Sequence, residues 1–94
     1  MALQMNYYYS LTETTIYNAY WRINPTFGIT GGKNGIKYTI EVFKNADSAH
    51  QENPKCLKGF TYSFMPNLKK SAPNFIEQAY NHAKAGNYSG SVDV

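Results

Sequence analysis

A stretch near the middle of the chain, Gly35–Lys44, alternates between apolar and polar side chains. Its apolar members, Ile36, Tyr38, Ile40 and Val42, fall on one side of an extended backbone, and most of the polar members fall on the other. Because successive side chains of a β-strand point to opposite faces, this pattern predicts a strand with one buried face and one solvated face. We expect the remainder of the chain to be organised around this strand.

Three further segments carry a similar alternation and are expected to be strands. They are Leu3–Leu11, Ile16–Ile23 and Leu57–Phe64, and Phe27–Thr30 is a candidate for an additional short strand. The segments that connect neighbouring strands are mostly short and polar, and one of them contains an Asn-Gly turn signal. Links of this kind favour antiparallel pairing between strands that follow one another in the sequence.

The segment after the last predicted strand has the apolar spacing of a helix. Its apolar stripe consists of Phe75, Ile76, Ala79, Tyr80 and Ala83. We expect Ser71 to cap the start of this helix and Gly86 to end it. Residues 87–94 are small and polar, which predicts an extended C-terminal tail.

Together these elements predict one small α+β domain that spans residues 1–94. Its length of 94 residues is typical of a single core. The expected architecture is an antiparallel sheet of about four strands, arranged as a meander, with one C-terminal helix packed on one face of the sheet.

Composition and charge limit the classes of function. Cys56 is the single cysteine, so an internal disulfide cannot form, and the chain shows neither an export signal nor an apolar run of membrane length. We therefore expect a soluble protein made in a reducing cytosol, with no membrane association. The net charge is only +3 and the basic residues are scattered. Nucleic-acid-binding proteins concentrate positive charge on one face, so the composition argues against nucleic acid as a partner.

No combination of nucleophile, base and orienting group occurs at an interpretable spacing, so we expect no enzyme, no catalytic residue and no cofactor. Asp47, His50 and Glu52 are the only cluster of metal-ligand types, within the polar segment Asn45–Lys55. That segment is expected to be a loop or a frayed helical turn, so we predict no metal site there. Gly31–Gly35 precedes a strand rather than a helix, which argues against a phosphate-binding loop.

Two regions supply candidate interaction residues. Tyr20 and Arg22 share the outer face of the second strand, and such a pair could anchor an interface, although an ordinary exposed strand face is the simpler interpretation. With Lys37 they could instead form a stacking and phosphate platform for a single-stranded nucleic acid. The end of the tail could add to a sheet edge, in this subunit or in a neighbour. The candidate interaction residues are therefore Tyr20, Arg22, Lys37, Tyr88, Val92 and Val94.

Several segments of the chain also support a resemblance to known proteins. They are residues 18–23, 38–43, 62–68, 73–80 and 92–94, of which Ala19–Ile23 and Asn74–Tyr80 are the most specific. In these segments the chain resembles small proteins of about this size that tailed-bacteriophage genomes encode, generally among the tail and virion structural genes. Met1–Tyr9 and the insertion Asn24–Asn34 match the pattern poorly. The resemblance implies a structural, virion-associated role and identifies no active site.

The resemblance and the composition lead to one main hypothesis. We expect a non-enzymatic structural protein of the virion, in the tail, baseplate or head–tail region. It would act by protein–protein assembly with other phage structural proteins, in multiple copies, after synthesis in the cytoplasm of the bacterial host. The alternatives are a phage assembly factor that is not packaged and a small module that binds single-stranded nucleic acid.

Overall fold

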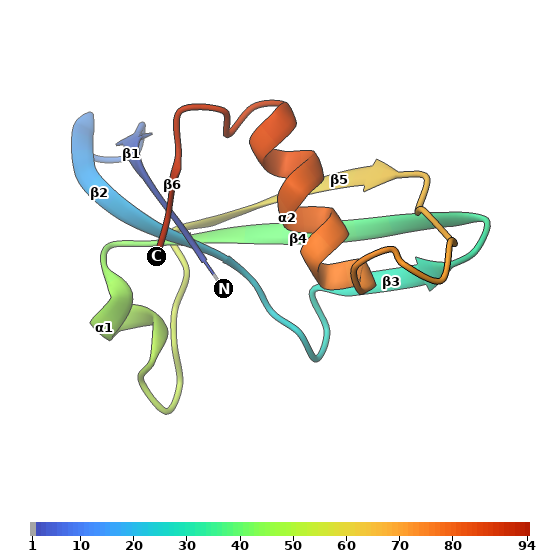
Figure 1. Ribbon diagram of the computed structural model, residues 1–94. Coiled ribbons are helices and arrows are strands. Elements are labelled where there is room, and N and C mark those ends of the chain that lie inside the picture. The colour runs from blue at the N-terminus through green and yellow to red at the C-terminus, as the bar shows by residue number, and fades with distance from the viewer. Residues whose placement is uncertain (1) are drawn as a thin grey trace.

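The strand predicted around Tyr38 lies at the centre of the sheet in the computed structural model, which describes residues 2–94 (Figure 1). The fold is α+β, with six antiparallel strands and two helices. The strands are β1 (Leu3–Tyr9), β2 (Thr14–Ile23), β3 (Ile29–Gly32), β4 (Gly35–Phe43), β5 (Lys58–Phe64) and β6 (Val92–Asp93). The helices are α1 (Ala46–Ala49) and α2 (Phe75–Ala85). The predicted class and antiparallel pairing are confirmed, but the sheet is larger than the predicted four strands.

β4 is paired along both of its edges. On one edge it pairs with β5 over seven positions, from Ile36 opposite Phe64 to Val42 opposite Lys58. On the other edge it pairs with β3 at one end and with β2 at the other. β1 then pairs with β2, and β6 pairs with β1. The four longest strands, β1, β2, β4 and β5, therefore follow one another as a meander, to which β3 and β6 are added.

β3 is separate from β2 because a short loop interrupts the segment that pairs with this edge of β4. Residues 24–28 leave the sheet between β2 and β3, and a backbone hydrogen bond of 2.8 Å from Gly28 N–H to the Asn24 carbonyl closes the loop. The Gly28 carbonyl then accepts a bond of 2.7 Å from Thr39 N–H, so the pairing with β4 resumes at once. Pro25 lies within this loop, where its missing N–H costs no ladder bond.

The alternation of β4 is confirmed by burial. Ile36, Tyr38, Ile40 and Val42 are each at most 2% exposed, and the last three join the core between the sheet and α2. The expectation that the opposite face is solvated is wrong at one end of the strand, because Phe43 is only 1% exposed. The single-turn helix α1 packs against β2 and β4 there. The Asn45 side chain caps α1 by accepting a 2.9 Å bond from Ser48 N–H.

A β-bulge reverses the alternation of β2. Met5 lies opposite Ala19, but Tyr7 lies opposite Ile16, so β2 contains one additional residue at this point. Asn18 takes up the extra length with φ of 55°, and its N–H donates a 2.8 Å bond to the Asn6 side chain. Asparagine tolerates this left-handed conformation better than most residues do. The bulge places Ile16, rather than Tyr17, against the core.

Helix α2 crosses the inner face of the sheet (Figure 1). The prediction of Ser71 as its cap is wrong: Asn74 caps the helix and accepts a 2.8 Å bond from Glu77 N–H. Gly86 ends the helix, as predicted. The Tyr80 hydroxyl accepts a 2.8 Å bond from Ile23 N–H, which ties the helix to the end of β2. The predicted architecture placed the helix last, but β6 follows it. Within residues 2–94, neither helix has the length and apolar character needed to span a bilayer.

Candidate functional site

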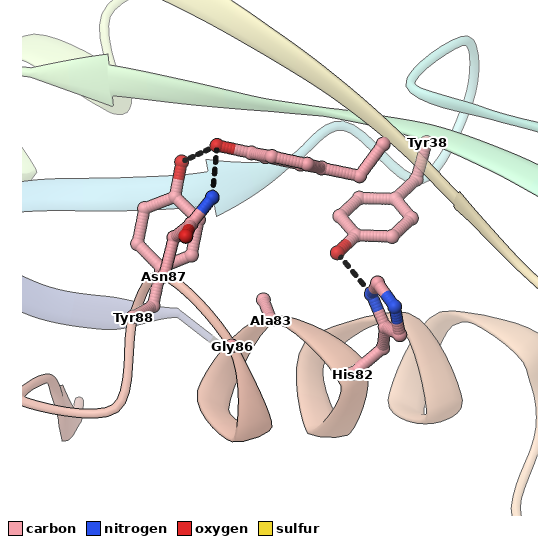
Figure 2. Close-up of a pocket in the computed structure, with 7 residues that line it drawn as sticks. Tyr38, His82, Ala83, Gly86, Asn87 and Tyr88 are labelled. Atoms are coloured by element: carbon pink, nitrogen blue, oxygen red, sulfur yellow. Dashed lines mark hydrogen bonds between the residues drawn. The ribbon is translucent and has the colours of Figure 1, made fainter.

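An aromatic cluster lines a partly open pocket between β4, β5 and the C-terminal end of α2 (Figure 2). Tyr38 and Tyr62 project from the sheet, and His82, Asn87 and Tyr88 project from the helix and the turn after it. The cavity between them has a volume of about 90 Å³. This is room for about three water molecules, at ~30 Å³ each, and too little for an organic ligand.

Tyr38 and His82 hold one side of this cluster together. The Tyr38 hydroxyl lies 2.8 Å from His82 Nδ1, and either partner can donate, depending on the imidazole tautomer. The imidazole ring also stacks on Phe64, with ring centroids 5.3 Å apart. Burial, with a smaller contribution from Tyr62, raises the pKa of Tyr38 to about 12. The phenol therefore keeps its proton at neutral pH.

Tyr88 holds the other side of the cluster. Its hydroxyl lies 3.1 Å from that of Tyr62, which also accepts a 3.4 Å bond from the Asn87 amide (Figure 2). Burial, followed by the hydrogen bond with Tyr62, raises the pKa of Tyr88 far above its usual value. Because these phenols stay protonated, they act as hydrogen-bond partners that fasten α2 and the following turn to the sheet.

Tyr88 was a candidate interaction residue, but the structure places it in the core. Its side chain is 3% exposed and packs edge-on against Trp21, with ring centroids 5.0 Å apart. Tyr88 N–H also bonds to the Ala83 carbonyl at the end of α2. This residue is therefore unavailable to a partner in this fold. Sequence reasoning missed its role because no periodic pattern extends past Gly86.

The last residues of the tail lie at a sheet edge. Val92 and Asp93 form β6 and pair with Gln4 and Leu3 of β1 in the same chain. Lys84 of α2 binds the Asp93 carboxylate at 3.2 Å, which ties the tail to the end of the helix. The side chains of Val92 and Val94 are 63% and 53% exposed. These two predicted residues remain accessible, next to the outer edge of the sheet.

The structure brings Tyr20 and Arg22 together and leaves Lys37 apart from them. The Tyr20 hydroxyl lies 3.5 Å from His50 Nε2, and Arg22 lies over the Phe43 ring, 5.0 Å from its centroid. Arg22 is opposite Glu41 in the sheet register. Lys37 is four residues further along β4, which is about 13 Å at ~3.3 Å per residue. The three side chains do not form one continuous platform.

The remaining titratable groups outside these clusters are dispersed. Within residues 2–94, no group of three His, Cys, Asp or Glu side chains could hold a metal ion. Cys56 is exposed and unpaired. Partial desolvation of its sulfur, followed by its neighbour Glu41, raises the pKa of the Cys56 thiol, which keeps the sulfur in its less reactive protonated form.

Comparison of the chain with protein-family models, with curated proteins and with solved structures finds no match.

The buried tyrosines predict a specific loss of stability at alkaline pH. An unfolded tyrosine ionises near pH 10, whereas Tyr38 in the fold keeps its proton until about pH 12. Between these values the unfolded chain has released a proton that the fold retains, so the free energy of unfolding falls as pH rises. The slope is about 1.4 kcal/mol per pH unit for each such tyrosine. Below pH 10 this contribution is fully present.

Urea unfolding between pH 8 and pH 11 measures this effect. Tyr38→Phe is expected to remove the Tyr38 part of the slope, and Tyr17→Phe, at a 73% exposed position, is expected to leave the slope unchanged. Equal slopes for Tyr38→Phe and the wild-type protein would contradict the assignment.

Proposed function

We propose that this protein is a non-enzymatic structural component of a bacteriophage virion that acts by assembly with other proteins. The observation that carries the proposal is the edge formed by β5. Among the described residues, this seven-residue strand pairs only with β4, so the backbone groups along its outer edge have no strand partner. Such an edge is a ready template for another chain unless something covers it.

Apolar side chains lie exposed just after the C-terminal end of β5 and elsewhere on the surface. Met65 follows β5 directly and is 72% exposed, and Leu68 is also exposed. Other exposed apolar side chains lie at the β1–β2 hairpin and at the tail; they are Tyr8, Leu11, Tyr17, Val92 and Val94. Single exposed apolar residues are ordinary, but apolar groups beside an unpaired strand favour a docking role. The resemblance to phage tail and virion proteins supplies the proposed setting.

The direct test is mass spectrometry of particles purified from the bacterium that carries the gene. The proposal expects the protein in the particles, in a fixed ratio to other particle proteins. If the protein is abundant in the lysate and absent from the particles, the virion assignment fails and the non-packaged assembly factor is supported.

A pair of surface variants tests whether the β5 edge is the docking surface. Met65→Glu combined with Leu68→Glu is expected to prevent incorporation, because charges beside the edge oppose burial against a neighbour. Phe27→Glu is the control, since Phe27 is as exposed as Met65 and lies in the loop on the other side of β4. Equal incorporation of the double variant and the control would contradict this surface.

The nucleic-acid alternative makes a different prediction. It requires Tyr20, Arg22 and Lys37 to act together, and their separation in the sheet does not favour this. Fluorescence anisotropy with single-stranded DNA at low salt would detect such binding, which should weaken steeply as salt is added.

A further inference from the structure

A second and larger depression lies beside Tyr20 and Arg22, where β2 leaves the sheet. Its volume is about 310 Å³, and its polar lining consists of Tyr20, Arg22, His50 and Tyr80. These side chains come from β2, from the residue that ends α1 and from α2. The fold therefore gathers one cation, two phenols and one imidazole from segments far apart in the sequence.

Arg22 is the feature of this groove that requires explanation. Its Nε is buried and has no hydrogen-bond partner within residues 2–94. The Phe43 ring, whose centroid lies 5.0 Å from the guanidinium carbon, interacts with the charge of the group but offers its N–H groups no oxygen or nitrogen acceptor. A guanidinium keeps its charge in proteins and carries five N–H donors, so a buried N–H without an acceptor is unfavourable.

The acidic residues of the chain do not satisfy this donor. Glu41 lies opposite Arg22 in the register of β2 and β4, yet the two form no ion pair. The Glu41 carboxylate instead neighbours the Cys56 thiol and contributes to the raised pKa of that thiol. Asp47 of α1 and Glu77 of α2 form no ion pair with Arg22 either; the ion pair within residues 2–94 is that of Lys84 with Asp93.

We propose that this groove binds a carboxylate group of a partner polypeptide. Because Nε is buried, Arg22 would hold the carboxylate through its two terminal nitrogens, whose parallel N–H groups match the two oxygens of a carboxylate. The Tyr80 hydroxyl already accepts a hydrogen bond from Ile23 N–H, so it can donate its own proton to the carboxylate. The Tyr20 hydroxyl supplies a further polar group at the same wall.

The rest of the groove suits the aliphatic part of the same ligand. Ile23, Pro25 and Ile76 form its apolar lining. A volume of about 310 Å³ is at the lower end of the range of ligand sites, ~300–1,000 Å³, and fits one amino-acid side chain better than a nucleotide. The inference rests on the proposed function, because an assembling protein requires contacts of this kind with its neighbours.

The proposal is tested by titrating the isolated protein with small carboxylates. NMR monitors the titration through the signal of the Arg22 Nε–H group. N-acetylvaline represents a chain terminus, and N-acetylaspartate α-methylamide represents an acidic side chain. At least one of them is expected to give saturable shifts at Arg22, with a dissociation constant on the order of 1–10 mM. N-acetylvalinamide, which lacks the charge, is expected to bind at least about tenfold more weakly.

Two variants localise the binding. Arg22→Lys keeps the charge but loses the planar pair of donors, and is expected to weaken binding at least about tenfold. Lys37→Met removes a positive charge from the same face outside the groove, and is expected to leave binding unchanged. The backbone spectrum of each variant shows whether the fold is retained. The comparison of N-acetylvaline with N-acetylvalinamide needs no variant, so it stands even if Arg22→Lys unfolds.

Three results of the carboxylate titrations would overturn the inference. They are the absence of saturable shifts at Arg22, equal binding of the amide and the carboxylate, and an equal loss of affinity in Lys37→Met and Arg22→Lys. Stronger binding of inorganic phosphate than of either carboxylate would also overturn it. The titration needs no partner protein, so its failure can be distinguished from failure of the proposed function. Absence of the protein from particles would contradict the proposed function alone.

Discussion

Replacing Trp21 with alanine is expected to lower the free energy of unfolding by about 3–5 kcal/mol, a large part of the stability of a small domain. Trp21 is 3% exposed, and its ring contacts Tyr7, Phe60 and Tyr88 at centroid distances of 5.4, 5.9 and 5.0 Å. Its indole N–H donates a 3.0 Å bond to the Met5 carbonyl. One side chain thus joins β1, β5 and the turn after α2, and alanine would leave a cavity among all three.

Thermal unfolding followed by circular dichroism measures this effect. A loss of this size corresponds to a fall in Tm of more than about 10 °C for a domain of this length. Tyr17→Ala, on the same strand, removes another aromatic ring but at a 73% exposed position, and should change stability by less than about 0.5 kcal/mol. Similar losses for the two variants would show that Trp21 does not hold the core together.

Replacing Gly31 with alanine is expected to destabilise the protein by about 3 kcal/mol, through backbone strain and overlap together. Gly31 has φ of 110°, a conformation that residues with a Cβ rarely adopt. A Cβ at this position would lie 2.2 Å from the backbone oxygen of Gly35, and neither strand of the β3–β4 hairpin can move away without breaking its pairing.

The neighbouring glycine provides the control for this prediction. A Cβ at Gly32 would meet no atom within 4 Å, and Gly32 does not share the positive φ of Gly31. Gly32→Ala should therefore be neutral within about 0.5 kcal/mol. Denaturant unfolding of both variants gives the difference. Equal stabilities would contradict the geometry of this hairpin.

The long elements were predictable from the sequence because each carries enough residues to display its period. β4 and β5 each show apolar side chains at alternate positions, and α2 shows its stripe over three turns. β6 has two residues, which is too few for any alternation to appear. α1 has four residues, and the sequence indicated it only as a possible helical turn. Its capping by Asn45 is a local hydrogen bond.

The limits of the sequence analysis lie where a local choice depends on distant contacts. Asn18 forms a bulge because Asn6, on the neighbouring strand, accepts its N–H. Tyr88 is buried because Trp21 and Tyr62 provide its surroundings. Tyr20 and Arg22 were identified as a pair from their positions on one strand. The groove beside them depends on His50 and Tyr80, which only the tertiary fold brings to this place.

The central position of β4 has a consequence for the order in which the chain folds. The β1–β2 and β3–β4 hairpins can close early because their partners are adjacent in the sequence, but the β2–β4 and β4–β5 pairs join segments that lie further apart. Contacts of long sequence separation delay the rate-limiting step, so we expect refolding in milliseconds or longer. Substitutions at Ile40 should mainly slow refolding, whereas substitutions in β6 should mainly hasten unfolding.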